Sequence, residues 1–226
     1  MYYCSLHFDF RQKFIRKMFH RLVLPIVRPG LGLRNQIRFC SSKLPTLFDG
    51  GGKVIKPDKS LDFYSVFGLE KSFNVDVLEL SQTYKQLQRQ LHPDKFVKAD
   101  PEDMEVSEEW SALVNDGYKI LQKPLPRALY LLDLVGFPLE EGSIDIDPEF
   151  LGEVMELNEE VAEADQNEIK LLADTVKNKL DDFIEIVDVL FANGEFEKAR
   201  EQVAHMKYYA NVLDKIYEKE TEFGMY

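Results

Sequence analysis

Cysteine is nearly absent from this sequence of 226 residues: it occurs only as Cys4 and Cys40. Residues 43–226 contain none, which excludes a disulfide framework, a cysteine zinc site and thiol catalysis in that part of the chain. Histidine is also scarce, and the other three histidines lie far from His92 in the sequence. We therefore expect no bound metal and no cofactor.

Long apolar runs are missing as well. The run LVLPIV at residues 22–27 is too short to cross a bilayer, and it contains Pro25. We therefore expect no transmembrane anchor and no membrane partner.

Charge is distributed unevenly along the chain, whose formal net charge is -12. Residues 1–60 hold 12 Lys and Arg against 3 Asp and Glu, whereas the remainder holds 16 against 37. A basic leader on an acidic body is typical of a targeting or interaction arm. The acidic body also argues against nucleic-acid binding.

The leader, residues 1–42, has the pattern of a basic amphipathic helix. Phe10, Phe14 and Met18 recur every four residues among several Lys and Arg side chains, with Asp9 as the one acid nearby. This resembles a mitochondrial import presequence, and RFCSS at residues 38–42 resembles a matrix-processing site. The leader predicts a mitochondrial matrix protein; a disordered basic arm is the alternative.

Residues 43–60 contain three consecutive glycines and two prolines, which predicts a linker. From Leu61 onward the periodicity is helical. Asp76 with Glu79 three residues later favours a helix start, and Pro93 ends that helix. Its apolar stripe follows steps of three and four: Val77, Leu80, Tyr84, Leu87 and Leu91. A second helix is expected at residues 107–122, which places residues 61–135 in one unit with a short connecting helix.

A second helical unit is predicted for residues 148–226, after a linker at 136–147. Asp147 and Pro148 form a helix start, and three long helices follow, with breaks near residues 164–166 and 193–194. The last helix keeps a spacing of three and four over several turns, which is typical of an antiparallel bundle. We therefore predict an all-α protein: two helical units, in an L or a tandem, the second a three-helix bundle.

The tripeptide His92-Pro93-Asp94 stands where the first long helix ends. Catalysis would need a nucleophile, and no serine or cysteine lies nearby; a metal site would need more ligands. A plain proline stop is the simplest alternative. Two antiparallel helices joined by a loop that begins with His-Pro-Asp, after the short helix FYSVFGL, resemble a J domain.

The resemblance to J domains implies a docking role, with the seventy-kilodalton heat-shock chaperone as partner. Lys85 and Arg89 are four residues apart on the side of the helix away from its apolar stripe, and Lys95 follows the tip. Three cations around one loop are unusual in a body that is otherwise acidic. A solvated basic face is the alternative. In J domains such cations meet an acidic face of the chaperone, whose ATPase the tip stimulates, so we expect this chain not to be an enzyme. The expected chaperone-binding residues are His92, Pro93, Asp94, Lys85, Arg89 and Lys95.

The second unit narrows the resemblance. RALYLL, FLGEVMELNEEVAEA and KYYANVLDKI resemble the HscB/Jac co-chaperones of iron–sulfur cluster biogenesis over roughly residues 61–220. At about 100° per residue, Leu151 and Met155 lie off the buried stripe, with acids nearly opposite it, and Tyr208 is about 200° from Met206. The resemblance implies that this face holds the cluster scaffold protein; scattered surface residues are the alternative. The expected scaffold-binding residues are Leu151, Met155, Glu156, Glu159, Glu163 and Tyr208.

Some positions depart from the family pattern. Gly152 stands where a bulky apolar residue is usual, and Gly117 replaces an alanine, at an expected cost of about 1 kcal/mol to its helix. Pro126 precedes the arginine of PRALYLL, and no four-cysteine zinc module precedes the hairpin. The first hypothesis is a monomeric co-chaperone that bridges scaffold and chaperone. A J protein for another client is the second, and a carboxylate hydrolase, which no nucleophile or phosphate loop supports, is the third.

Overall fold

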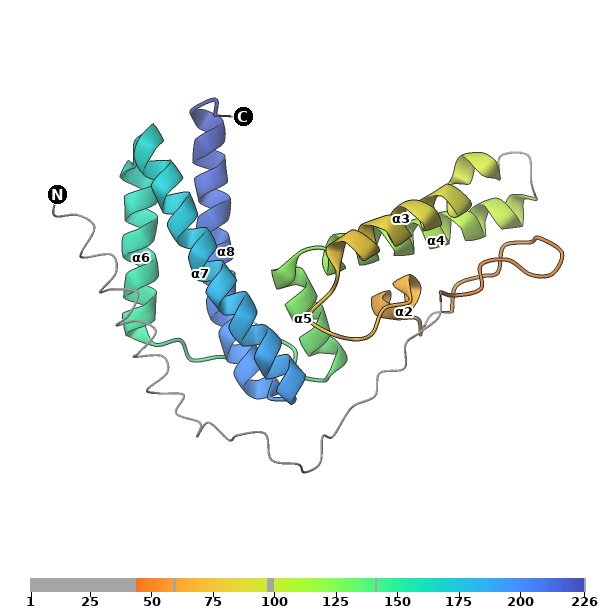
Figure 1. Ribbon diagram of the computed structural model, residues 1–226, viewed down its shortest axis with the longest axis horizontal. Coiled ribbons are helices and arrows are strands. Elements are labelled where there is room, and N and C mark those ends of the chain that lie inside the picture. The colour runs from red at the N-terminus through yellow and green to blue at the C-terminus, as the bar shows by residue number, and fades with distance from the viewer. Residues whose placement is uncertain (1–43, 59, 97–99, 141, 226) are drawn as a thin grey trace. The chain divides into compact units, whose positions relative to one another are not determined.

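The computed structural model describes residues 44–58, 60–96, 100–140 and 142–225, so the predicted presequence lies outside it (Figure 1). Every regular element in these ranges is helical, apart from one isolated bridge between Phe48 and Val54. The helices are α2 (Phe63–Phe67), α3 (Val77–Leu91), the 3-10 turn η1 (Pro93–Lys95), α4 (Pro101–Leu121), α5 (Pro124–Leu134), α6 (Pro148–Glu163), α7 (Gln166–Asn193) and α8 (Phe196–Glu222). The prediction of an all-α hairpin followed by a three-helix bundle is confirmed. No described helix is long and apolar enough to cross a bilayer.

The hairpin consists of α3 and α4. Asp76 caps α3 by accepting hydrogen bonds from the backbone N–H groups of Leu78 and Glu79, at 2.8 and 3.1 Å. The helix ends at His92, which has an extended ψ of 127°, because a following proline disfavours the helical conformation. Polar contacts join the two helices: the Tyr84 hydroxyl donates to Asn115 Oδ1 at 2.9 Å, and the Tyr84 and Tyr118 rings stack at 4.1 Å.

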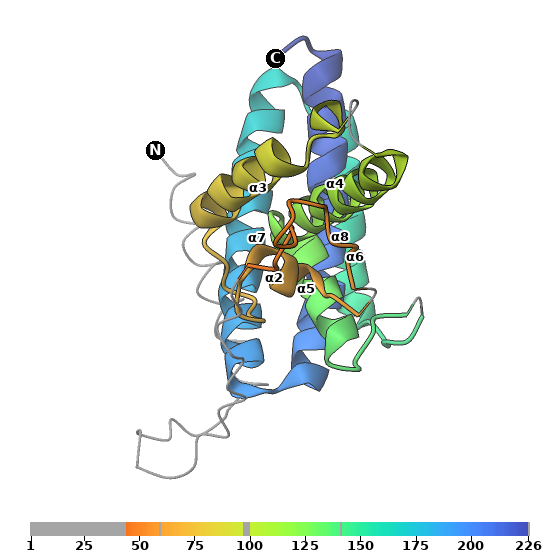
Figure 2. The same cartoon turned by 90° about the vertical axis from the view of Figure 1, so that its right-hand side faces the viewer.

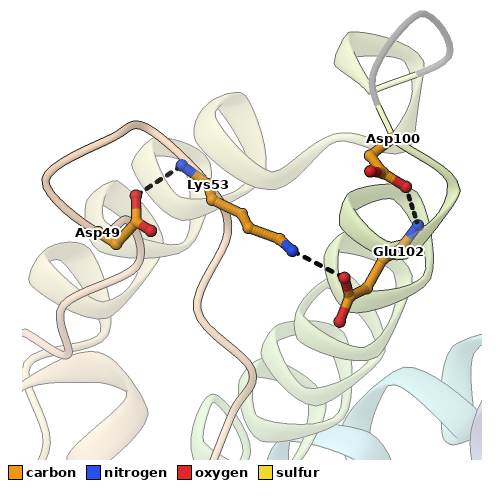
Figure 3. Close-up of polar contacts among 4 residues, drawn as sticks. All are labelled: Asp49, Lys53, Asp100 and Glu102. Atoms are coloured by element: carbon orange, nitrogen blue, oxygen red, sulfur yellow. Dashed lines mark hydrogen bonds and ion pairs between the residues drawn. The ribbon is translucent and has the colours of Figure 1, made fainter.

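Residues 44–58, predicted as part of a linker, pack against α4; we call them the strap. Leu47 and Val54 are buried, and Trp110 Nε1 donates a 2.6 Å hydrogen bond to the Ile55 carbonyl. The Asp49 carboxylate accepts hydrogen bonds from the backbone of Gly51 and Lys53, which closes a tight turn. Figure 3 shows Lys53 reaching from this turn to Glu102 at the start of α4, an ion pair of 2.7 Å. The consecutive glycines therefore form a turn that folds back on the hairpin.

The three-helix bundle is built by α6, α7 and α8. A complete capping box starts α7: the Asp165 carboxylate accepts a hydrogen bond from the backbone N–H of Glu168, and the Glu168 carboxylate accepts one from the backbone N–H of Asp165. Gly194, with φ +74°, ends α7 in the left-handed conformation and turns the chain into α8. The buried residues of the bundle come from all three helices: Val154, Val161, Ala164, Ile169, Ala173, Val176, Phe183, Met206, Tyr209, Val212 and Ile216.

A second buried cluster contains residues of the hairpin together with residues of α7 and α8. It includes Val187 and Leu190 of α7 and Ala199 and Val203 of α8, beside the buried side of α5. The Phe73 and Phe191 rings stack with centroids 5.6 Å apart. These contacts join the end of the bundle to α5, and the described residues between 44 and 225 belong to one compact unit.

Arg127 of α5 is a buried charge in this cluster. Its Nη1 donates a 2.7 Å hydrogen bond to the Leu121 carbonyl at the end of α4, and its guanidinium lies 5.1 Å from the centre of the Phe73 ring. Burial lowers the pKa of Arg127, and electrostatic interactions with Tyr64 and Asp188 oppose this shift. The guanidinium thus satisfies a carbonyl at the end of α4 and also lies against the Phe73 ring. A lysine has no planar group that could stack on the ring in this way.

Candidate partner-binding sites

The His-Pro-Asp tip begins where α3 stops. The backbone N–H of Asp94 donates to His92 Nδ1 at 3.3 Å, and the Asp94 carboxylate lies 3.5 Å from the same nitrogen. The Lys95 N–H donates to the His92 carbonyl at 3.0 Å, so the backbone turns through η1 at Pro93. The side chains of His92 and Asp94 remain 56% and 85% exposed. The tip is thus a fixed turn with polar side chains that the fold does not bury.

The two helix cations of the predicted docking face lie on the solvent side of α3. Leu80, Leu87 and Leu91 are buried against α4, whereas Lys85 and Arg89 are exposed. Lys95 is exposed just past the tip. The structure therefore places all three cations at the surface, on the helix and turn that carry the tip. No group of three or more His, Cys, Asp or Glu suited to a metal occurs among the described residues.

The predicted scaffold-binding residues of α6 divide into two sets around the helix. Leu151 is half-buried and Met155 is 63% exposed, and at about 100° per residue they lie about 40° apart. The acids are all exposed and occupy the next part of the helix surface: Glu156, Glu159 and Glu163. Val154 and Val161 face the core instead. The helix therefore presents an apolar strip beside an acidic one.

Tyr208 of α8 lies beside the first turns of α6, since these two helices run side by side (Figure 2). Its ring meets the Phe150 ring edge-on, with centroids 5.8 Å apart. Phe150 directly precedes Leu151, so Tyr208 and the apolar strip are on neighbouring turns of adjacent helices. Tyr208 thus lies near the start of α6, where Leu151 is, while Met155 and the three acids follow farther along that helix.

Several residues behind this face escaped the sequence-based predictions. His205 is half-buried, with its ring 4.3 Å from Phe150; burial lowers the pKa of His205, and nearby Asp147 opposes the shift. Two α8 lysines tie α6 in place: Lys215 Nζ donates to Asn158 Oδ1 at 2.7 Å, and Lys219 Nζ donates to the carbonyls of Val161 and Ala162. Lys215 and Lys219 are four residues apart, which predicts that they share one face of α8. The sequence does not indicate which helix that face contacts.

Comparisons with known proteins agree on one family. Residues 146–217 match the family described as the HSCB C-terminal oligomerisation domain. The mouse iron–sulfur cluster co-chaperone protein HscB is 42% identical over 163 residues, which cover 71% of this chain and 69% of the mouse protein. The crystal structure of human co-chaperone protein HscB superposes with a TM-score of 0.74 at 37% identity, covering 79% of this chain and 92% of that one. Chaperone HscB from Vibrio cholerae gives a TM-score of 0.63 at 30% identity, with coverages of 72% and 99%.

Proposed function

Because this chain belongs to the HscB family of iron–sulfur cluster co-chaperones, we propose that it bridges two partners in cluster assembly. The bundle binds the cluster scaffold protein through α6 and α8. The hairpin is a J domain that stimulates the ATPase of the mitochondrial seventy-kilodalton heat-shock chaperone. The bridge brings scaffold and chaperone together, which promotes transfer of the cluster.

The proposed chaperone binding by the hairpin is supported by the charged residues at its tip. His92 and Asp94 are exposed although the turn that holds them is ordered by hydrogen bonds, so their side chains are available for a partner. Lys85, Arg89 and Lys95 give a basic surface on a chain whose net charge is -12. Such a local excess attracts an acidic surface and speeds its association. The ATP chemistry belongs to the chaperone, and this chain is a partner without enzymatic activity of its own.

The main observation that supports scaffold binding by the bundle is the exposure of Met155 on the helix that also carries Leu151, near Tyr208 of α8. Met155 is 63% exposed in the middle of a helix whose core residues are well packed. Covering a methionine of this kind on binding is worth about 1.5–3 kcal/mol. An apolar centre with acids at its edge has the anatomy of a protein interface, in which charge sits at the rim.

We also propose that the protein acts in the mitochondrial matrix, to which the basic leader directs it. The leader would be removed near residue 42, and the remaining chain would contain no cysteine. A monomer suffices for the bridging role, since one chain carries both surfaces.

The test is ATP turnover by the mitochondrial chaperone with this protein and the scaffold added separately and together. We expect each to stimulate weakly and the pair to act synergistically. His92→Gln should return turnover to the rate measured without this protein and leave scaffold binding intact. Leu151→Ala combined with Tyr208→Ala should weaken scaffold binding and spare the stimulation that needs no scaffold.

Matched controls separate these effects from unfolding. Leu171→Ala alters a leucine of α7 that is 60% exposed, and Lys119→Ala alters an exposed cation of α4; neither should change turnover or binding. Circular dichroism checks that each variant keeps its helices. Stimulation that ignores the scaffold would contradict the bundle assignment and favour a J protein for another client. Absence of any stimulation would contradict the assignment of the His-Pro-Asp tip.

A further inference from the structure

A cavity of about 250 Å³ lies next to Tyr208, between α8 and the segment that leads into α6. The segment contributes Ile144 and Ile146, and α8 contributes Ala204, Lys207, Tyr208 and Asn211. Tyr208 therefore belongs both to this cavity and to the proposed scaffold-binding face. The cavity and that face therefore meet at Tyr208, and the cavity lies on the side of the segment that precedes α6.

The size of the cavity restricts what it can hold. Pockets for cofactors and drug-sized molecules occupy about 300–1,000 Å³, so this cavity lies just below the usual range for a free ligand. One or two side chains of a docked protein would fill it. A side chain that enters such a pocket next to an exposed apolar strip is the usual anchor of a protein interface.

The apolar wall of the cavity is surface that folding leaves partly uncovered. Ile144 and Ile146 are only half-buried and contribute to neither of the two buried clusters. They are held beside α8 by a segment without helical structure between α5 and α6. Covering them would remove apolar area from water, which favours an apolar occupant.

The rim of the cavity carries a positive charge. Lys207 is exposed and takes part in no ion pair among the described residues. Glu140 is also at the rim, exposed Asp145 and Asp147 flank Ile146, and Asn211 adds a neutral amide, so Lys207 is a cation among acids. On α6, by contrast, Glu156, Glu159 and Glu163 are all negative. The cavity end of the surface thus contains a cation, Lys207, whereas α6 contains no Lys or Arg.

We propose that this cavity is an anchor pocket for the scaffold protein and fixes the direction in which the scaffold lies on the bundle. An apolar side chain of the scaffold enters between Ile144 and Tyr208, with a scaffold carboxylate paired to Lys207. The basic part of the scaffold surface then faces the acids, up to Glu163, about 18 Å along α6 from Leu151. This inference rests on the proposed scaffold binding and adds its orientation.

The experiment is calorimetric titration of the cluster-free scaffold protein into the full chain and its variants. Ile144→Ser should weaken binding about tenfold, because the anchor loses its apolar wall. Lys207→Glu should weaken it about fivefold through slower association, and the effect should fade near 1 M salt, where the Debye length is about 3 Å. The matched controls are Val189→Ser and Lys170→Glu on α7, which should bind as the unaltered chain does.

The possible outcomes distinguish failure of the anchor pocket from failure of the scaffold binding on which it rests. Weaker binding in both cavity variants, with unchanged controls, supports the anchor pocket. If Tyr208→Ala weakens binding but both cavity variants match the controls, scaffold binding stands and the anchor pocket is wrong. If only Ile144→Ser weakens binding, the carboxylate and the proposed direction are wrong. If the unaltered chain does not bind the scaffold, both proposals fall.

Discussion

At the residue scale, two glycines inside helices occupy opposite environments. A Cβ on Gly117 of α4 would lie 2.9 Å from the Phe67 ring and 3.0 Å from the Phe63 ring, and both rings belong to α2. A Cβ on Gly152 of α6 would have no atom within 4 Å. Gly117 therefore allows α2 to approach α4 closely, which explains a residue that costs its own helix stability. Gly152 has no such packing role.

The two glycine-to-alanine substitutions should therefore change stability in opposite directions. Gly152→Ala should raise the free energy of unfolding by about 0.5–1 kcal/mol, because alanine restricts the unfolded chain and favours the helix. Gly117→Ala gains the same term but displaces two packed rings at a cost of about 1–3 kcal/mol, so the net effect should be a loss of about 1 kcal/mol. Denaturant unfolding of both variants measures the difference. A stabilising Gly117→Ala would show that α2 moves freely on α4.

At the element scale, the strap shows how far sequence patterns can mislead. Three consecutive glycines and two prolines predict a linker because each is a poor member of a helix or strand. The structure uses the glycines for a turn instead, with Gly52 at φ +85°. The evidence for packing is non-local: Trp110 bonds the Ile55 carbonyl across 55 positions, and no local pattern in residues 43–60 reveals that partner. Helix starts such as Asp76 could be predicted because their signals are local.

The strap offers two leucines, three residues apart, for a matched test. Leu47 is 7% exposed and Leu44 is 42% exposed. Leu47→Ala should lower the free energy of unfolding by about 2–3 kcal/mol, because the side chain is part of the buried cluster of the hairpin. Leu44→Ala should change it by less than about 0.5 kcal/mol. Equal and negligible effects, measured by denaturant unfolding, would mean that the strap is a free linker after all.

The candidate sites show the same limit between local and non-local information. Exposure of Lys85 and Arg89 follows from helical periodicity, and so does the division of α6 into an apolar and an acidic strip. The cavity beside Tyr208 could not be predicted, because it depends on where the segment before α6 crosses α8. In the sequence, Ile144 and Ile146 alternate with Asp145. That pattern does not indicate that α8, much later in the chain, packs beside them.

At the scale of the whole molecule, α5 decides how the hairpin and the bundle are coupled. Its sequence PLPRALYLLDL is apolar on nearly every side, which is typical of a helix buried between two neighbours. Leu131 and Leu132 are buried in the cluster that also contains Val187 and Leu190 of α7. The sequence predicted only a connecting helix, because helical periodicity does not identify the surface against which a helix packs. The shared cluster means that unfolding the hairpin would expose part of the bundle.

We therefore expect hairpin and bundle to unfold in one transition, as measured with two probes of different location. Trp110 is the only tryptophan of the chain and lies in the hairpin, so its fluorescence reports that part. Far-ultraviolet circular dichroism reports all helices, most strongly the long α7 and α8. The two curves should coincide for the unaltered chain, which is the test of a single cooperative transition.

Phe191→Ala should separate the two unfolding curves. Phe191 contributes the α7 side of the ring stack with Phe73, and its removal leaves a cavity in the contact that joins the two parts. Because Phe191 is only partly buried, its truncation should cost about 1–3 kcal/mol, less than that of a fully buried phenylalanine but enough to let the less stable part unfold first. Val189→Ala, two positions away and 59% exposed, should leave the curves coincident. Separate curves in the unaltered chain would contradict the coupling, and would mean that the two proposed binding surfaces lie on independently stable units.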